Sequence, residues 1–163
     1  MDKARIDSYS EELYQALRGA KVVDPLLARE PGISIEDAYQ IQLGLIRRRM
    51  ERDGETIIGK KIGATSKAVQ TMLKVDQPDF GHLMSSMAYN DGDVVPIEGN
   101  LIQPRMEGEI AFILKRDLLG PGITNAAVLA ATECVMPCFE ICDSRIRDWK
   151  IGIQDTVADN ASA

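Results

Sequence analysis

Residues 104–113 read Pro-Arg-Met-Glu-Gly-Glu-Ile-Ala-Phe-Ile, and this stretch decides the expected fold and site. Its composition predicts a β-strand from Glu107 to Leu114. Side chains two residues apart in a strand point to the same face, so Glu107 and Glu109 should project together, with Cα atoms roughly 7 Å apart. The opposite face begins with Ile110, is apolar, and is expected to be buried.

Two neighbouring carboxylates repel each other unless something compensates their charge. A hard divalent cation such as Mg²⁺ or Mn²⁺ would do so, because these ions prefer oxygen ligands. Glu140 lies between apolar neighbours in a second predicted strand, Cys138 to Asp143, where an acidic group needs a partner. The alternative is a solvated strand face at Glu107 and Glu109, and the pattern leaves both readings open.

Lysines 60 and 61 lie in another predicted strand, residues 56–63, which glycines bound. Alternation places Lys60 and Lys61 on opposite faces, so one of them is expected to face inward. An inward lysine would serve as a charge partner or a proton donor. A solvated strand lysine is the alternative, and periodicity does not separate the two.

Residues 77–81, Gln-Pro-Asp-Phe-Gly, are predicted to form a turn or loop, where an aspartate such as Asp79 is usually structural. His82 is the single histidine, and we interpret it as structural, since a serine-hydrolase triad would depend on it alone. The three cysteines follow a C-x3-C-x3-C spacing that differs from common zinc sites, which favours buried free thiols.

The remaining chain predicts a mixture of short helices and strands. Ser34 and Asp37 resemble a capping box that starts a helix ending at Asp53-Gly54. Further helices are expected over residues 6–18, from Ser66 to Leu73, and from Thr124 to before Pro137, and a strand is expected around Ile151 and Ile153. The order lacks a strict βαβ rhythm and favours an α+β fold.

The 163 residues suit one domain over 1–163, with a net charge of −6 and 45% hydrophobic residues. The acidic balance argues against a nucleic-acid partner. The sequence contains no apolar run long enough for a transmembrane helix and no signal-peptide pattern, so we expect no membrane association and a cytoplasmic location.

Five ordered blocks resemble one family, the 2-keto-4-pentenoate hydratases. These blocks are residues 58–66, 77–81, 103–111, 139–145 and 155–162, which together cover essentially the whole chain. The resemblance implies the fold of the fumarylacetoacetate hydrolase catalytic domain, a mixed β-roll with peripheral helices. Residues 1–55 would be the helical N-terminal part, and residues 56–163 the first part of the roll. Relatives continue beyond these blocks, so the roll is expected to be incomplete at the C-terminus.

The resemblance also implies roles for particular residues. It assigns Mg²⁺ or Mn²⁺ binding to Glu107, Glu109 and Glu140. Catalysis falls on Lys61 and Asp79, with no distinction between acid and base, and Ser162 is expected near the substrate.

The implied reaction is the hydration of 2-hydroxypenta-2,4-dienoate to 4-hydroxy-2-oxopentanoate in aromatic meta-cleavage catabolism. The expected partners are this small acid, further copies in a homo-oligomer, and a related decarboxylase. Two alternatives remain: a 4-oxalocrotonate decarboxylase, which shares the motifs, and a non-catalytic partner subunit or fragment, which need not bind Mg²⁺.

Overall fold

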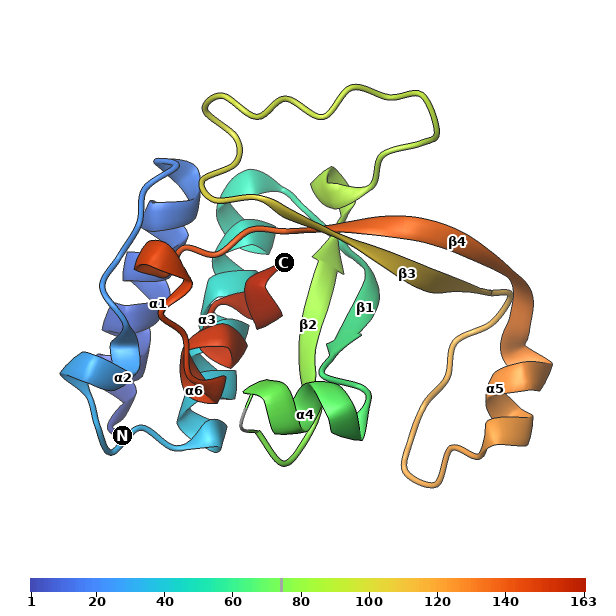
Figure 1. The fold of residues 1–163 in the computed structure, drawn as a ribbon, viewed down its shortest axis with the longest axis horizontal. Coiled ribbons are helices and arrows are strands. Elements are labelled where there is room, and N and C mark those ends of the chain that lie inside the picture. The colour runs from blue at the N-terminus through green and yellow to red at the C-terminus, as the bar shows by residue number, and fades with distance from the viewer. Residues whose placement is uncertain (74) are drawn as a thin grey trace. The chain divides into compact units, whose positions relative to one another are not determined.

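The computed structural model describes residues 1–73 and 75–163. The chain forms two units: unit 1 comprises residues 1–104 together with 143–163, and unit 2 comprises residues 105–142 (Figure 1). The prediction of a single domain over 1–163 stays a prediction.

Unit 1 begins with helices whose ends the sequence encodes. Helix α1 (Lys3–Arg18) is capped by Asp2, whose side chain accepts a hydrogen bond from the backbone N–H of Arg5. Helix α2 (Leu26–Arg29) is short. Helix α3 (Ile35–Asp53) starts with the predicted capping box and ends at Gly54, whose φ of 70° is left-handed.

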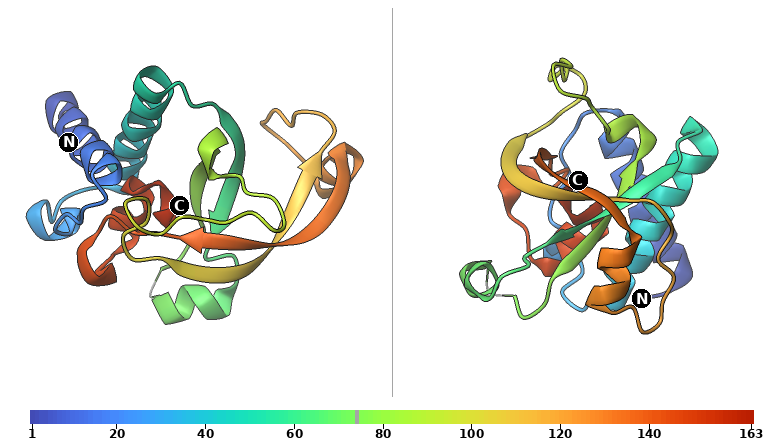
Figure 2. Two further views of the ribbon diagram at one scale, coloured as in Figure 1. Left: turned by 90° about the horizontal axis from the view of Figure 1, so that it is seen from above. Right: turned by 90° about the vertical axis from the view of Figure 1, so that its right-hand side faces the viewer.

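The core of unit 1 lies where α1 and α3 pack together and α6 (Ile153–Ala158) packs on α3. Figures 1 and 2 show the α1 and α3 helices running side by side. Burying one apolar stripe from each helix supplies most of their stability. The core consists of Leu13, Tyr14, Leu26, Ile33, Ala38, Ile41, Leu45, Ile146, Val157 and Ala158.

Beside these helices, β1 (Ile57–Gly63) and β2 (Asp79–Met84) pair antiparallel. Helix α4 (Lys67–Leu73) connects them, and a 3-10 turn (Ser85–Met87) follows β2. The prediction of a turn or loop over 77–81 is wrong from Asp79 onward. Pairing with β1 outweighs the local turn preference of Pro78-Asp79, and the turn ends where β2 begins.

The last part of unit 1 contains a 3-10 turn (Arg147–Trp149), helix α6, and a final turn (Asn160–Ser162). The predicted strand around Ile151 and Ile153 is wrong, because Ile153 starts α6. Asp155 at the third position of α6 accepts the backbone N–H of Gly152, which favours a helix start over an extended strand.

Unit 2 is a two-stranded antiparallel ribbon of β3 (Arg105–Leu114) and β4 (Thr132–Cys142), with α5 (Asn125–Ala131) before β4. The helix predicted to reach almost to Pro137 ends at Ala131. Pro137 lies within β4 opposite Ile110, a position that a two-stranded ribbon tolerates because neither strand has a second neighbour in the ribbon.

The expectation that the face of Ile110 is buried is wrong. Ile110 is 64% exposed and Phe112 52% exposed. A two-stranded ribbon with one short helix offers little surface to cover that face.

The α+β class is therefore confirmed, since each unit contains both helix and an antiparallel ribbon. Among the helices of residues 1–73 and 75–163, none combines the length and hydropathy needed to cross a bilayer.

Candidate functional site

Lys61 and Asp79 lie on the same face of the β1–β2 ribbon. In the register, Lys61 is paired with Gly81, and Gly63 with Asp79, so the two charged residues are diagonal neighbours. Asp79 is buried, and within the described residues its Oδ1 atom has no hydrogen-bond partner. A buried acceptor of this kind is costly unless a ligand or water uses it, which marks the ribbon face as a candidate site.

Two glycines make room for this arrangement. A Cβ atom on Gly63 would lie closer than 3.0 Å to Oδ1 of Asp79. A Cβ atom on Gly81 would lie only 2.4 Å from the backbone oxygen of Asn160. Both positions therefore need glycine because another chain segment approaches closely, with no requirement for a left-handed backbone.

The ammonium group of Lys61 is held by the Asn160–Ser162 turn. Lys61 Nζ donates to the backbone oxygen of Ala161 at 2.8 Å. Lys60, on the opposite face, is exposed. The inward lysine is therefore Lys61, and its ammonium lies beside the turn that carries Ser162.

The side-chain amide of Asn160 makes two hydrogen bonds to the backbone of His82 in β2, a contact called the Asn160 clamp below. Its Oδ1 accepts the backbone N–H of His82 at 2.8 Å, and its Nδ2 donates to the His82 oxygen at 2.9 Å. The His82 side chain takes no part in this clamp. Its burial, and secondarily the charge of Lys60, lower the pKa of the imidazole, which favours the neutral form.

The turn around Ser162 has an unusual backbone. Asn160, Ala161 and Ser162 have φ values of 58°, 56° and 56°, in the left-handed region that costs non-glycine residues roughly 1–2 kcal/mol each. Ser162 is buried, and its Oγ lies 3.0 Å from Oγ1 of Thr156. The surrounding contacts must hold this conformation, as is common at functional sites.

A buried ion pair joins Arg145 to Asp159, the residue directly before the Asn160–Ser162 turn in the chain, and helps to hold that turn. Arg145 Nε donates to Asp159 Oδ1 at 2.5 Å, and the Arg145 backbone N–H donates to Oδ2 at 2.8 Å. Both side chains are at most 2% exposed. Burial raises the pKa of the Asp159 carboxyl to about 6, although the charge of Arg145 opposes that rise.

In unit 2, the register places Glu107 directly opposite Glu140. These two carboxylates and the thiol of Cys142 each offer a ligand atom, and the three atoms lie within 4.8 Å of one another. Two carboxylates and a thiol form a donor set that fits a divalent cation. Glu109 lies on the same face, opposite Cys138, and is not a member of this group of three.

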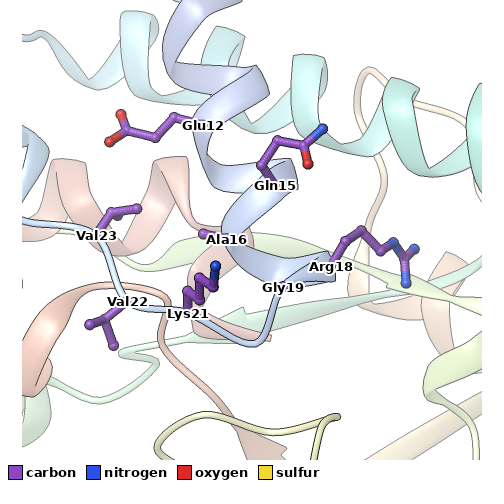
Figure 3. Close-up of a pocket in the computed structure, with 8 residues that line it drawn as sticks. All are labelled: Glu12, Gln15, Ala16, Arg18, Gly19, Lys21, Val22 and Val23. Carbon is purple, nitrogen blue, oxygen red and sulfur yellow. The ribbon is translucent and has the colours of Figure 1, made fainter.

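A hollow of about 470 Å³ lies at the C-terminal end of α1 in unit 1 (Figure 3). Its lining contains none of the predicted site residues, so we assign it no part in catalysis. It is lined by Glu12, Gln15, Ala16, Arg18, Gly19, Lys21, Val22 and Val23.

Sequence reasoning missed the roles of Asn160, Asp159 and Arg145. It also missed Gln42, whose Nε2 donates at 2.8 Å both to the oxygen of Phe80 in β2 and to that of Val157 in α6. The available signal was a polar residue among the apolar residues of α3, because such a residue must find partners when buried.

The comparison with known proteins decides the family. The chain is 64% identical over 162 residues to a 2-hydroxypent-2,4-dienoate hydratase from Pseudomonas putida. The matched residues make up 99% of this chain and 72% of that protein. The chain belongs to the 2-keto-4-pentenoate hydratase family. The expected family, and with it the expectation of a hydratase, a hydro-lyase, is confirmed.

Two further comparisons agree with this family. A 2-hydroxyhexa-2,4-dienoate hydratase from Comamonas testosteroni is 60% identical over 162 residues, which are 99% of this chain and 61% of that protein. A solved 4-oxalocrotonate decarboxylase from Pseudomonas putida G7, complexed with magnesium and adipate, superimposes with a TM-score of 0.91 at 34% identity. That match covers all of this chain and 61% of the decarboxylase chain. No general family model matches the sequence.

Proposed function

We propose that this protein hydrates 2-hydroxypenta-2,4-dienoate to 4-hydroxy-2-oxopentanoate with the help of a divalent cation, in aromatic meta-cleavage catabolism. The observation that carries the proposal is the 64% identity to a dienoate hydratase over nearly the whole chain. The chain spans between 61% and 72% of the hydratases compared above, so the proposal concerns the complete enzyme. A complete β-roll of the fumarylacetoacetate hydrolase type and a homo-oligomer belong to the same proposal.

The reaction has two steps, and in each step one proton is removed and one proton is added. In the first step, a proton leaves the 2-oxygen of the dienol and a proton is added at C5. In the second, water loses a proton as its oxygen forms a bond to C4, and a proton is added at C3. Each step therefore requires one group that accepts a proton and one that donates it.

Lys61 and Asp79 supply these groups in the proposed mechanism. Asp79 is the acceptor, because its buried Oδ1 has no hydrogen-bond partner in the described part of the chain. Lys61 is the donor, because its ammonium is oriented by the Ala161 oxygen and shares a face with Asp79. Ser162 would orient the substrate, and it lies in the same turn (Asn160–Ser162) as Ala161.

Glu107, Glu140 and Glu109 would hold the cation, with Mg²⁺ or Mn²⁺ as the expected ions. The structure's donor set of Glu107, Glu140 and Cys142 fits a divalent ion, and the decarboxylase that this chain resembles was solved with magnesium. Such an ion, when bound, stabilises negative charge on the 2-oxygen as a Lewis acid.

The test follows the loss of the dienoate's ultraviolet absorbance with added Mg²⁺ or Mn²⁺, and again after chelation. Cation-dependent loss that yields 4-hydroxy-2-oxopentanoate would support the proposal. If this chain is inactive, the same assay on a chain extended to the length of the Pseudomonas putida relative separates a fragment from a wrong assignment. Inactivity of both would refute it.

A decarboxylase is the second candidate, because the solved structure compared above is a 4-oxalocrotonate decarboxylase. Its 34% identity is well below the 64% of the hydratase, which favours hydration. Release of carbon dioxide from 4-oxalocrotonate without hydration of the dienoate would favour the decarboxylase over the hydratase. Absence of both activities and of cation binding would favour the partner-subunit alternative, in which this chain associates with a related decarboxylase.

A further inference from the structure

One face of β4 is unusually rich in sulfur. Alternate residues of a strand share a face, so the face that carries Glu140 also carries four sulfur-containing side chains. They are Cys134, Met136, Cys138 and Cys142. The cation ligands of the proposed function therefore lie among thiols, an environment that a purely oxygen-binding site does not need.

Cys142 is the thiol that groups with two of these carboxylates. Its sulfur lies within 4.8 Å of a carboxylate oxygen of both Glu107 and Glu140. Ligand atoms that share one Zn²⁺ ion lie roughly 3–4 Å apart, given metal–ligand distances of about 2.0–2.3 Å. The three side chains therefore need only small rotations to bind one ion together.

We propose that Cys142 is itself a ligand of the cation centre, with Glu107 and Glu140. The inference rests on the metal centre of the proposed function and adds a sulfur donor to it. Thiolate ligands favour borderline ions, so the centre should bind Co²⁺ and Zn²⁺ more tightly than Mg²⁺. On binding, the thiol gives up its proton to solvent and a metal–sulfur bond forms.

The competing explanation is that Cys142 is a buried thiol that only fills space. Cys138 provides a matched control for that explanation. It lies on the same strand and the same face, opposite Glu109, yet is outside the group of three. A nonspecific effect of removing a thiol from β4 should appear at both cysteines, whereas loss of a ligand should appear at Cys142 alone.

The experiment is a Co²⁺ titration of the full chain, followed by the near-ultraviolet charge-transfer absorption that a thiolate–Co²⁺ bond produces. We expect this band in the unmodified chain and in Cys138→Ser, and its loss in Cys142→Ser. We also expect Cys142→Ser to weaken Co²⁺ binding by about tenfold or more, with a smaller change for Mg²⁺. Identical Co²⁺ spectra of the unmodified chain and a folded Cys142→Ser would overturn the inference.

A second measurement avoids any dependence on the folding of Cys142→Ser. X-ray absorption of the Co²⁺ complex of Cys138→Ser should show a sulfur scatterer at a metal–thiolate distance of about 2.3 Å. A shell of oxygen and nitrogen alone would overturn the inference.

Dienoate hydration with Mg²⁺ on the same preparations tests the proposed function separately. A thiolate band without turnover by any cation, in this chain and in the extended chain, would keep the Cys142 ligand and remove the hydratase assignment. Turnover with Mg²⁺ but no thiolate band would keep the hydratase assignment and remove the Cys142 ligand.

Discussion

Gly63 leaves the space that the carboxylate of Asp79 occupies. The two residues are register partners of β1 and β2, and a Cβ atom at position 63 would lie closer than 3.0 Å to Asp79 Oδ1. The glycine therefore decides where the proposed proton acceptor lies. This relationship gives a first test of the site that leaves every charged group in place.

Gly63→Ala should displace Asp79 and reduce hydration while every candidate catalytic residue remains. Overpacking of this kind costs about 1–3 kcal/mol of unfolding free energy. Gly59→Ala is the matched control, because its Cβ atom would meet Leu83 Cδ1 at an ordinary 3.4 Å. Turnover and chemical denaturation of both variants provide the measurement. Equal activity in the two would show that the position of Asp79 is unimportant.

Lys61→Met should reduce the hydration rate by about 10²–10⁴-fold, the range expected for loss of a proton-transfer group. Lys60→Met removes the neighbouring lysine from the exposed opposite face and should leave the rate nearly unchanged. Steady-state kinetics on both variants, at saturating cation, separate these outcomes. A similar loss in both would point to general charge effects.

Asn160→Asp keeps the acceptor for the His82 N–H but removes the donor to the His82 oxygen. Leaving that partly buried carbonyl without its partner should cost about 1–3 kcal/mol. Asn100→Asp makes the same change in an exposed loop, where Nδ2 donates to the Pro96 oxygen and water can replace it. Thermal or urea unfolding should therefore separate the two variants, and equal stability would contradict the clamp.

Asp159→Asn should be strongly destabilising, because it leaves the buried guanidinium of Arg145 without its anion. Removing one member of a buried ion pair typically costs about 3–5 kcal/mol. Asp24→Asn provides the comparison, since the Asp24–Arg147 pair is exposed and solvent screening should leave it little effect on stability. Urea midpoints of the two variants measure the difference, and similar midpoints would argue against a supporting role of Asp159.

Acid should weaken the contact between α1 and α3 through Glu11. Hydrogen bonds from Arg52, Gln15 and Arg48 lower the pKa of Glu11 from 4.5 to about 2. A carboxyl with a lowered folded-state pKa stabilises the fold above its unfolded pKa and loses that contribution as pH falls from about 4.5 to about 2.

The comparison is between the unmodified chain and Glu11→Gln across this pH range. Because Glu11 is about one-third exposed, we expect a difference of less than about 1 kcal/mol at pH 7. The difference should shrink as the carboxyl becomes protonated. A constant difference down to the lowest pH would contradict this origin.

Local signals predicted part of this structure well. The capping box at Ser34 and Asp37, and the glycine stop at Gly54, are properties of a few adjacent residues, and both helix ends follow them. The strand that carries Glu107 and its side-chain alternation were predicted for the same reason.

Features that depend on distant residues were missed. Asp79 looks like a turn residue until β1 pairs with it, and Asn160 gains its role only by meeting His82, 78 residues away in sequence. The roles of Lys61 and Ser162 came from resemblance to a family, since periodicity left Lys60 and Lys61 equivalent. Propensity alone does not encode such tertiary contacts.

The division of the chain has a consequence for synthesis on the ribosome. Unit 1 is discontinuous, because residues 143–163 return to complete what residues 1–104 begin. Lys61 cannot reach its acceptor until Ala161, 100 residues later, has emerged from the exit tunnel. Until residues 143–163 are made, the apolar faces of the nascent helices lack part of their cover. Apolar surface exposed in this way is prone to aggregation while unit 2 is being translated.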